Sequence, residues 1–178
     1  KNKATLMEEI LPATQDIAAI VGFIDFDKQR IGPDQRLIRH NSAAVVQNGE
    51  LLQIVHKRLL PAYRYFDDKR YFAEGDEVEP VSIQTCEGEI SIGVLICEDL
   101  WDAKYELKPC EIYREKGVDY LFTINASPFV GSSTGSNDGK RFVRERFLEQ
   151  QTRNYGIPIV YVNTVGIGDN GKNIIPFD

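Results

Sequence analysis

The segment Asn41–Val55, NSAAVVQNGELLQIV, carries the clearest structural signal in the sequence. It holds two apolar runs of strand length, Ala43–Val46 and Leu51–Val55, on either side of the pair Asn48-Gly49. Asparagine and glycine both tolerate the positive φ angles of a tight turn, so the pair is typical of a two-residue hairpin turn. The pattern therefore predicts a β-hairpin.

A second hairpin is predicted around Glu87-Gly88, between the apolar runs Val81–Thr85 and Glu89–Ile96. Its second strand ends at Cys97, where the chain turns into a polar stretch. The carboxyl ends of buried strands are places where α/β proteins present ligand-contacting residues. Cys97 is therefore a candidate functional residue, although a free cysteine more often serves as a small buried hydrophobic side chain.

The flanking segments alternate between helix and strand patterns, which predicts a mixed sheet with helices packed on one or both faces. Upstream, the patterns predict a helix over Leu6–Asp16 that Pro12 ends or kinks, a strand covered on both faces over Ala18–Phe26, and a loop over Asp27–Arg39. Downstream, they predict helices over Lys104–Lys116 and Arg141–Arg153, strands over Tyr120–Ile124 and Ile159–Val162, and a loop over Gly131–Gly139.

Length and composition fit one globular domain over residues 1–178, because 178 residues with 42% hydrophobic content can bury a proper core. The net charge of -6, with both signs interleaved, argues against a nucleic-acid partner. No apolar stretch has the length that a membrane span needs, and the first residues lack the layout of a signal peptide. We expect a soluble protein without a membrane partner.

The three cysteines, Cys86, Cys97 and Cys110, form an odd set without a CxxC pair. This argues against a disulfide framework and against a structural zinc site, and it favours a cytoplasmic location. Both ends of the chain read as cuts, because the first residues resemble the end of an amphipathic helix and the last follow a turn-rich stretch. We expect a domain that is truncated at both ends.

A nucleophilic cysteine needs a group that takes its proton or stabilises its thiolate. The two histidines, His40 and His56, both lie upstream of Cys97, which disfavours a papain-like pair of cysteine and histidine. A carboxylate base acting together with a lysine is the remaining chemistry. Lys57 stands at the end of its own predicted hairpin strand and is the candidate lysine.

Four short segments follow one another in a characteristic order: KRLLPAYRYFDDKRYF at 57–72, CEDLW at 97–101, NASPF at 125–129 and YVNTVG at 161–166. The first is similar to the lysine motif of the nitrilase superfamily, and the second to its nucleophile motif. Together they most resemble the glutaminase domain of glutamine-dependent NAD synthetases. Thr164 departs from that group, which commonly has glutamine at this position.

The resemblance implies an α/β fold of the nitrilase-like αββα sandwich type and a Glu-Lys-Cys triad that hydrolyses glutamine. In such a site a carboxylate takes the thiol proton and the thiolate attacks the carboxamide carbon. Ammonia then leaves an acyl-enzyme, which water hydrolyses. Cys97 would be the nucleophile, and the ammonium of Lys57 would stabilise the tetrahedral oxyanion.

The triad glutamate has no match in this sequence. Glu8 and Glu9 are the nearest by position, but they stand in a helical stretch and are expected at the surface. The resemblance places the base upstream, so the chain alone is expected to be inactive. Asp68 stands where the family usually has a second glutamate that positions the lysine and the substrate; an exposed ion pair with Lys69 or Arg70 is the alternative for this shorter side chain.

By the same resemblance the glutamine pocket would be lined by Tyr63, Glu98, Trp101, Ser127 and Lys140. Glu98 would pair with the substrate α-ammonium, Tyr63 and Trp101 would wall the cavity, and Lys140 would hold the substrate carboxylate. Plain core packing is the alternative for each aromatic side chain.

The resemblance implies no cofactor in this domain. ATP and Mg would serve a C-terminal synthetase domain, absent from this sequence, that makes NAD from deamido-NAD. The substrate would be glutamine or another small amide, and a homo-oligomer is expected. Two alternatives remain open: a stand-alone amidase or carbamoylase of the same superfamily, and a non-catalytic domain that retains the fold.

Overall fold

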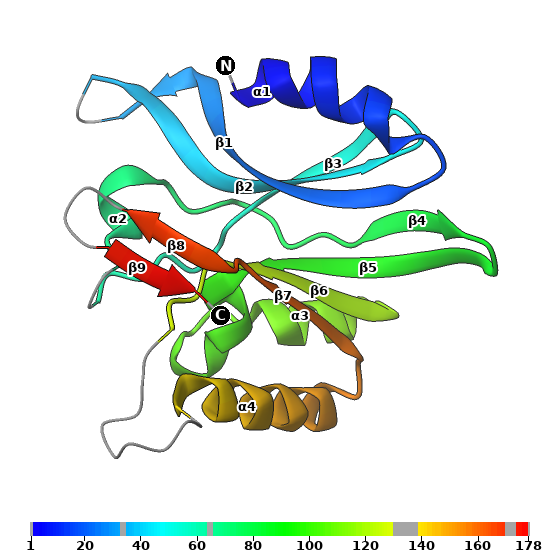
Figure 1. Ribbon diagram of the computed structural model, residues 1–178, viewed down its shortest axis with the longest axis vertical. Helices are drawn as coiled ribbons and strands as arrows, with labels where there is room; N and C mark the ends of the chain where they lie inside the picture. Colours follow the sequence, from blue (N-terminus) through cyan, green and yellow to red (C-terminus); the bar gives the residue numbers. More distant parts are fainter. Residues whose placement is uncertain (1, 33–34, 64–65, 130–138, 170–173, 178) are drawn as a thin grey trace.

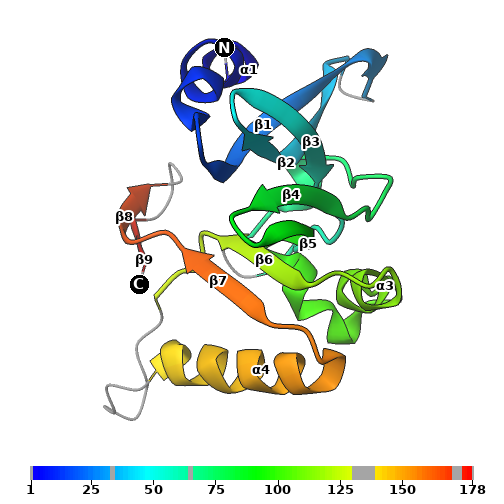
Figure 2. The same cartoon turned by 90° about the vertical axis from the view of Figure 1, so that its right-hand side faces the viewer.

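The computed structural model describes residues 2–32, 35–63, 66–129, 139–169 and 174–177, and these are arranged in layers. Figures 1 and 2 show an N-terminal helical segment, a first sheet, a second sheet and a final layer of helices. This order of helix, sheet, sheet and helix is the layer arrangement that the resemblance implies. Two sheets therefore face each other in the middle of the molecule.

The N-terminal segment consists of consecutive short helical pieces: α1 (Asn2–Thr5), the π-helical turn η1 (Leu6–Ile10) and the 3-10 turn η2 (Leu11–Thr14). Pro12 lies in the first turn of η2, where its fixed φ angle and missing N–H are tolerated. The predicted interruption of the helix at Pro12 is confirmed. Leu6 and Leu11 are buried against the outer face of the first sheet.

The first sheet is antiparallel and contains β1 (Ala18–Ile31), β2 (Leu37–Gln47) and β3 (Glu50–His56), in that order. The turn between β2 and β3 has φ angles of 52° at Asn48 and 80° at Gly49. These angles are the ones that an Asn-Gly hairpin turn requires, so the hairpin predicted from the sequence is confirmed.

The predicted loop over Asp27–Arg39 is wrong, because β1 continues to Ile31 and β2 begins at Leu37. Asp27 pairs with Ile38 and Ile31 pairs with Leu37, with a register shift between them. The polar residues 28–30 within this shift are exposed, so no apolar pattern marks the extension as a strand. Over Ala18–Phe26, side chains do contact apolar clusters on both faces. Most of these side chains are only partly buried, because β1 is an edge strand of its sheet.

The second sheet contains β4 (Val81–Thr85), β5 (Gly88–Ile96), β6 (Tyr120–Asn125) and β7 (Ile159–Asn163). β4 pairs antiparallel with β5, whereas β5, β6 and β7 are parallel, so the predicted mixed sheet is confirmed. The parallel strands end together, since Ile96 pairs with Ile124 and Asn125 pairs with Asn163. The segments that follow these strands consequently meet at one edge.

The outer helices are α3 (Pro109–Glu115) and α4 (Gly139–Tyr155), which cover the second sheet (Figure 1). The helix predicted from Lys104 begins only at Pro109, because proline favours the first turn of a helix. Gly117 follows the helix with a φ of 71°, as expected for a glycine stop. The 3-10 helix η3 (Cys97–Lys104), which directly follows β5, was not anticipated.

The remaining elements are the helical turn α2 (Asp68–Tyr71) and the antiparallel pair β8 (Gly166–Asp169) and β9 (Ile174–Phe177). The predicted loop over Gly131–Gly139 lies outside the described residues, apart from Gly139, which begins α4. In the described part of the chain, no helix combines the length and the apolar character that crossing a bilayer requires.

The interior contains an apolar cluster at each interface between layers. Along β2, Val45 belongs to the cluster between the sheets, whereas Val46 belongs to the cluster beneath the N-terminal helices. Along β5, Val94 faces the first sheet and Leu95 faces α3 and α4. Strands covered on both faces are apolar at successive positions, which explains the continuous apolar runs in the sequence.

Candidate active site

A cavity of about 530 Å³ is lined by residues from both sheets. The first sheet and its following residue contribute Ile20, Gly22, Asn41 and Lys57, and the segment beyond contributes Phe66 and Asp68. The strand ends of the second sheet contribute Ile96, Cys97, Ile124, Asn125, Ala126, Val162, Asn163 and Thr164. The cavity therefore lies where the carboxyl ends of the parallel strands meet, the usual position of a binding site in an α/β sheet.

Lys57 directly follows β3, and its backbone is held on both sides. Its N–H donates to the Asn41 carbonyl (2.8 Å), and its carbonyl accepts the N–H of Gly75 (2.9 Å). Gly75 has to be glycine for this approach, because a Cβ there would lie 2.6 Å from the Cβ of His56. The Lys57 Nζ donates to Asp68 Oδ2 at 2.6 Å, and the lysine side chain is only 4% exposed.

Cys97 stands at the turn from β5 into η3 with a φ of 51°. A positive φ is uncommon for a residue other than glycine, and such strain concentrates at functional sites. The thiol is free and half-buried. Burial raises the pKa of Cys97 above its usual value, while the Lys57 ammonium opposes that shift. The thiol is consequently held protonated until a base removes its proton, and the lysine favours the thiolate once it forms.

The structure brings Lys57, Asp68 and Cys97 together around one cavity. Asp68 is the one carboxylate among the described residues that line this cavity, and it is engaged by Lys57. Glu8 and Glu9, which the sequence places at the surface, are exposed on η1. The described lining thus offers a nucleophile and an ammonium, but no carboxylate besides the one that binds the lysine.

Glu98 and Tyr63 lie next to the cavity and bind each other. The Tyr63 hydroxyl donates to Glu98 Oε2, and the Tyr105 hydroxyl donates to Glu98 Oε1, both at 2.8 Å. Glu98 itself is buried, whereas the Tyr63 side chain is largely exposed. Neither Tyr63 nor Glu98 is among the described residues that line the cavity.

Trp101 stacks on Phe147 of α4, with ring centroids 3.9 Å apart and an interplanar angle of 9°. It packs against the cluster between the second sheet and the outer helices rather than among the described cavity residues. Ser127 is buried, and its N–H donates to Asn163 Oδ1 at 2.8 Å. Lys140 lies in the first turn of α4, and its side chain lies outside the described residues.

Polar cavity residues that the sequence analysis did not propose for the site are Asn41, Asn125 and Asn163; Thr164, noted there only as a departure from the family, also lines the cavity. Asn125 and Asn163 are paired across β6 and β7, and the Thr164 N–H donates to the Asn125 carbonyl at 2.9 Å. A polar residue that ends an apolar strand was the available signal for both asparagines. In the described residues, no group of three His, Cys, Asp or Glu side chains is arranged to hold a metal ion.

The sequence matches the carbon-nitrogen hydrolase family over residues 7–174. The chain belongs to this family. The glutamine-dependent NAD(+) synthetase of Synechocystis is 31% identical over 172 residues, which cover 93% of this chain and 28% of the relative. That of Xanthomonas campestris is 33% identical over 175 residues, which cover 97% of this chain and 27% of the relative. The chain therefore spans little more than a quarter of these relatives.

Solved structures agree with this assignment to the carbon-nitrogen hydrolase family. The glutamine-dependent NAD+ synthetase of Acinetobacter baumannii superposes with a TM-score of 0.77 at 28% identity, covering 99% of this chain and 28% of that one. A carbon-nitrogen hydrolase from Helicobacter pylori has the same fold, with a TM-score of 0.69 at 24% identity, covering 94% of this chain and 55% of that one. The resemblance to the nitrilase superfamily is confirmed.

Proposed function

We propose that Cys97 is the nucleophile of an amide hydrolase and that Lys57 stabilises the oxyanion that forms in its reaction. The observation that carries this proposal is that Lys57 and Cys97, which come from different sheets, line the same cavity. The positive φ of Cys97 supports it, because a purely structural cysteine has no need for a strained backbone.

The reaction begins when a base takes the thiol proton and the thiolate attacks the carboxamide carbon. The carbonyl π electrons move onto oxygen, and the ammonium of Lys57 stabilises the resulting negative charge in the cavity. The C–N bond breaks and the nitrogen takes up a proton. Ammonia departs, and the acyl group remains bound to Cys97 as a thioester. Water then attacks the thioester, so the carboxylic acid departs and the thiol is restored.

The proton acceptor is proposed to be a carboxylate that does not belong to the matched motifs of this chain. Asp68 is less suited to this role, because its Oδ2 already accepts a charge-assisted hydrogen bond from Lys57. We therefore assign to Asp68 the task of holding the ammonium in place. A partly buried counter-ion keeps the lysine extended at the cavity instead of leaving it free to sample many rotamers.

The proposed substrate is glutamine, and the proposed use of the ammonia is ATP-dependent synthesis of NAD from deamido-NAD. The two curated relatives described above carry the name glutamine-dependent NAD(+) synthetase, and this supports the proposal. The chain spans only part of their length, so ATP and Mg would belong to a synthetase part outside residues 1–178. A stand-alone amidase would instead prefer other small amides.

The test is ammonia release from glutamine and from a panel of small amides, with the protein expressed from its full reading frame. Cys97→Ala should lower the rate by at least about 1,000-fold, because no other group can form the thioester. Cys86→Ser is the matched control, since Cys86 is an exposed free cysteine, and it should leave the rate unchanged. Equal ammonia release by the Cys97→Ala variant would refute the nucleophile assignment.

A further inference from the structure

Lys57 and Cys97 follow strands of two different sheets, so their separation depends on whatever joins the sheets at this end. Apolar packing between the sheets is not directional and sets such a distance only loosely. Hydrogen bonds to the backbone on either side of the two residues would set it more closely. One buried side chain, that of Asp99 in η3, makes bonds of this kind to both segments.

Asp99 is 2% exposed, and both of its carboxylate oxygens are occupied by backbone donors. Oδ1 accepts the N–H of Arg58 at 3.0 Å and the N–H of Leu59 at 2.7 Å. Oδ2 accepts the N–H of Ile96 at 3.1 Å. Arg58 and Leu59 directly follow Lys57, and Ile96 directly precedes Cys97, so a single carboxylate connects both reactive segments.

The bond to Ile96 also restrains the backbone of Cys97. It closes a small ring from the Ile96 N–H to the Asp99 side chain, and the strained φ of 51° at Cys97 lies inside this ring. Unfavourable backbone angles persist only where contacts of the surrounding structure hold the backbone in that conformation. Asp99 is thus placed to hold both the turn that presents the thiol and the segment that presents the ammonium.

Keeping a carboxylate at this position is costly for the fold. Burial raises the pKa of Asp99 to about 6, although three backbone N–H groups and Lys57 favour its charged form. The side chain is therefore mostly ionised at neutral pH despite its buried position. A neutral side chain would avoid this desolvation penalty. Only a carboxylate, however, has two acceptor oxygens that can bind the N–H groups of Arg58 and Leu59 on one side and that of Ile96 on the other.

We propose that Asp99 is a positioning residue, whose carboxylate sets the position of Lys57 relative to Cys97 by bonding the backbone next to each of them. The proposal rests on the proposed function, because it gives Asp99 no contact with substrate. Asp99→Asn keeps the size of the side chain but replaces one acceptor oxygen by an NH₂ donor. That donor would face either the Ile96 N–H or the N–H groups of Arg58 and Leu59.

The measurement is the rate at which iodoacetamide alkylates Cys97, followed by peptide mass spectrometry as the pH is raised. The exposed Cys86 in the same molecule serves as the internal reference. Lys57 lowers the pKa of Cys97, whereas the negative charge of Asp99 raises it, so two explanations predict opposite signs. If Asp99 positions Lys57, Asp99→Asn slows alkylation near neutral pH by about threefold or more. If only the charge matters, alkylation becomes faster, and the proposal is overturned.

Asp102→Asn is the matched control, because Asp102 is a buried carboxylate of the same helix η3. Its oxygens accept the N–H of Cys110 at 3.0 Å and the hydroxyl of Tyr155 at 3.5 Å, which lie on α3 and α4. This variant also loses a buried carboxylate, yet the reactivity of Cys97 should not change. A similar slowing in Asp102→Asn would show a general loosening of the fold and would overturn the proposal.

A double variant separates positioning from general damage. In a Lys57→Met background the ammonium is already gone, so Asp99→Asn should cause no further slowing of Cys97 alkylation. An equal slowing in both backgrounds would contradict an action through Lys57. Because alkylation needs no catalysis, its outcome is independent of ammonia release. Failure of the wild-type protein, expressed from its full reading frame, to hydrolyse amides would refute the proposed function and leave the positioning result readable.

Hydrogen exchange of the wild-type protein covers the case in which Asp99→Asn does not fold. The amides of Arg58, Leu59 and Ile96 should exchange slowly, because each donates to a buried carboxylate. Their protection should weaken as the pH falls through about 6, where Asp99 becomes protonated. Rapid exchange of Arg58 and Leu59 at neutral pH would overturn the proposal without any variant.

Discussion

The two faces of the first sheet carry different polar groups on adjacent residues of the same strands. On the inner face, Asn41 and Lys57 line the cavity together with Cys97, which directly follows β5 of the second sheet. On the outer face, beneath the N-terminal helix, lie His40 and His56. Successive residues of a strand point to opposite faces, so a step of one residue separates these two environments.

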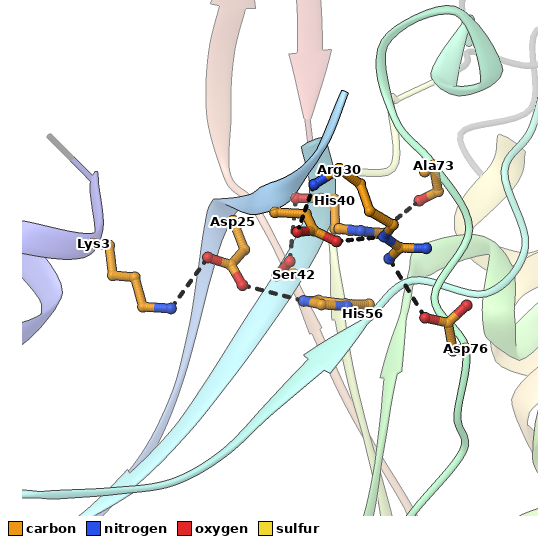
Figure 3. Close-up of polar contacts among 9 residues, drawn as sticks. Lys3, Asp25, Arg30, His40, Ser42, His56, Ala73 and Asp76 are labelled. Atoms are coloured by element: carbon orange, nitrogen blue, oxygen red, sulfur yellow. Dashed lines mark hydrogen bonds and ion pairs between the residues drawn. The ribbon is translucent and has the colours of Figure 1, made fainter. Parts of the chain in front are cut away.

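Figure 3 shows the outer cluster, in which the two imidazole rings are stacked 4.2 Å apart at an angle of 5°. His56 Nε2 lies 3.3 Å from Asp25 Oδ2, and Lys3 Nζ donates to Asp25 Oδ1, also at 3.3 Å. His40 Nδ1 lies 3.1 Å from the carbonyl of Ala73. These contacts connect α1, β1, β2, β3 and the segment after α2. The cluster therefore serves to hold these elements together.

Residue type alone is a poor guide to the reactive face of this sheet. Histidine is the usual partner of a catalytic cysteine, yet both histidines lie on the face turned away from Cys97. The lysine meets the thiol because it lies on the face that looks toward the second sheet. The opposing sheet, and not the chemistry of the first strands by themselves, determines which face can react.

Replacing Lys57 on the inner face should affect amide hydrolysis far more than replacing His56 on the outer face. Lys57→Met should lower kcat by about 100- to 1,000-fold, because the oxyanion loses its ammonium. His56→Gln, one residue earlier and on the outer face, should change kcat by less than about threefold. Steady-state ammonia release measures both, and comparable losses in the two variants would erase the distinction between the faces.

Removal of Lys57 also leaves Asp68 without its partner, so stability needs its own control. The double variant Lys57→Met/Asp68→Asn removes both charges and should melt at a higher temperature than Lys57→Met alone. Its hydrolytic rate should stay as low as that of the single variant. A recovery of activity in the double variant would contradict the role assigned to the ammonium.

Asp68→Asn sharpens the account of the inner face through the reactivity of the thiol. The charge of Asp68 raises the pKa of Cys97, but Asp68 also holds the Lys57 ammonium that lowers it, so a positioning role predicts slower Cys97 alkylation near neutral pH in Asp68→Asn. Hydrolysis should also fall by about tenfold, because the ammonium is held less firmly. Asp68→Glu, which introduces the residue usual in the family, should retain most of the activity. Unchanged hydrolysis in Asp68→Asn would refute a positioning role.

The outer face should show its contribution in stability and not in catalysis. Burial, and then the neighbouring His56, lower the pKa of His40 from its usual value of 6.5. Because the pKa of His40 is lower in the folded state, the folded state favours the neutral ring. The contribution of His40 to the free energy of unfolding is therefore fully present above pH 6.5, and it is lost as the pH falls through the pKa of the folded state. The other charges facing the pair are those of Lys3, Asp25, Arg30 and Asp76.

Thermal unfolding at several pH values tests this smallest effect. The melting temperature of the wild type should fall on going from about pH 7 to about pH 5.5, and His40→Gln should reduce that fall. Ammonia release by His40→Gln at neutral pH should stay close to the wild-type rate. If the melting temperature of His40→Gln falls with pH as much as that of the wild type, the pH dependence arises from groups other than His40.

Sequence patterns predicted the hairpins and the buried strands, because turn chemistry and continuous apolar runs are local properties. The Asn48-Gly49 turn and the strand β5, which ends at Ile96 directly before Cys97, are examples. The polar extension of β1 to Ile31 and the late start of α3 at Pro109 were not predicted. The extension of β1 pairs with β2 at Asp27 and Ile31 but carries no apolar pattern that would mark it as a strand. The start of α3 was missed because the residues ahead of the proline are compatible with a helix.

The amino-acid sequence by itself determined the family of this chain, its layer type and the identity of the two residues proposed to carry the chemistry. Only the tertiary structure decided that Lys57 and Cys97 share a cavity, that Trp101 packs on α4, and that Asp99 joins both reactive segments. Short-range patterns record turns and burial, whereas contacts between two sheets depend on how those sheets are stacked. Such contacts join residues far apart in the chain, so no local pattern contains them.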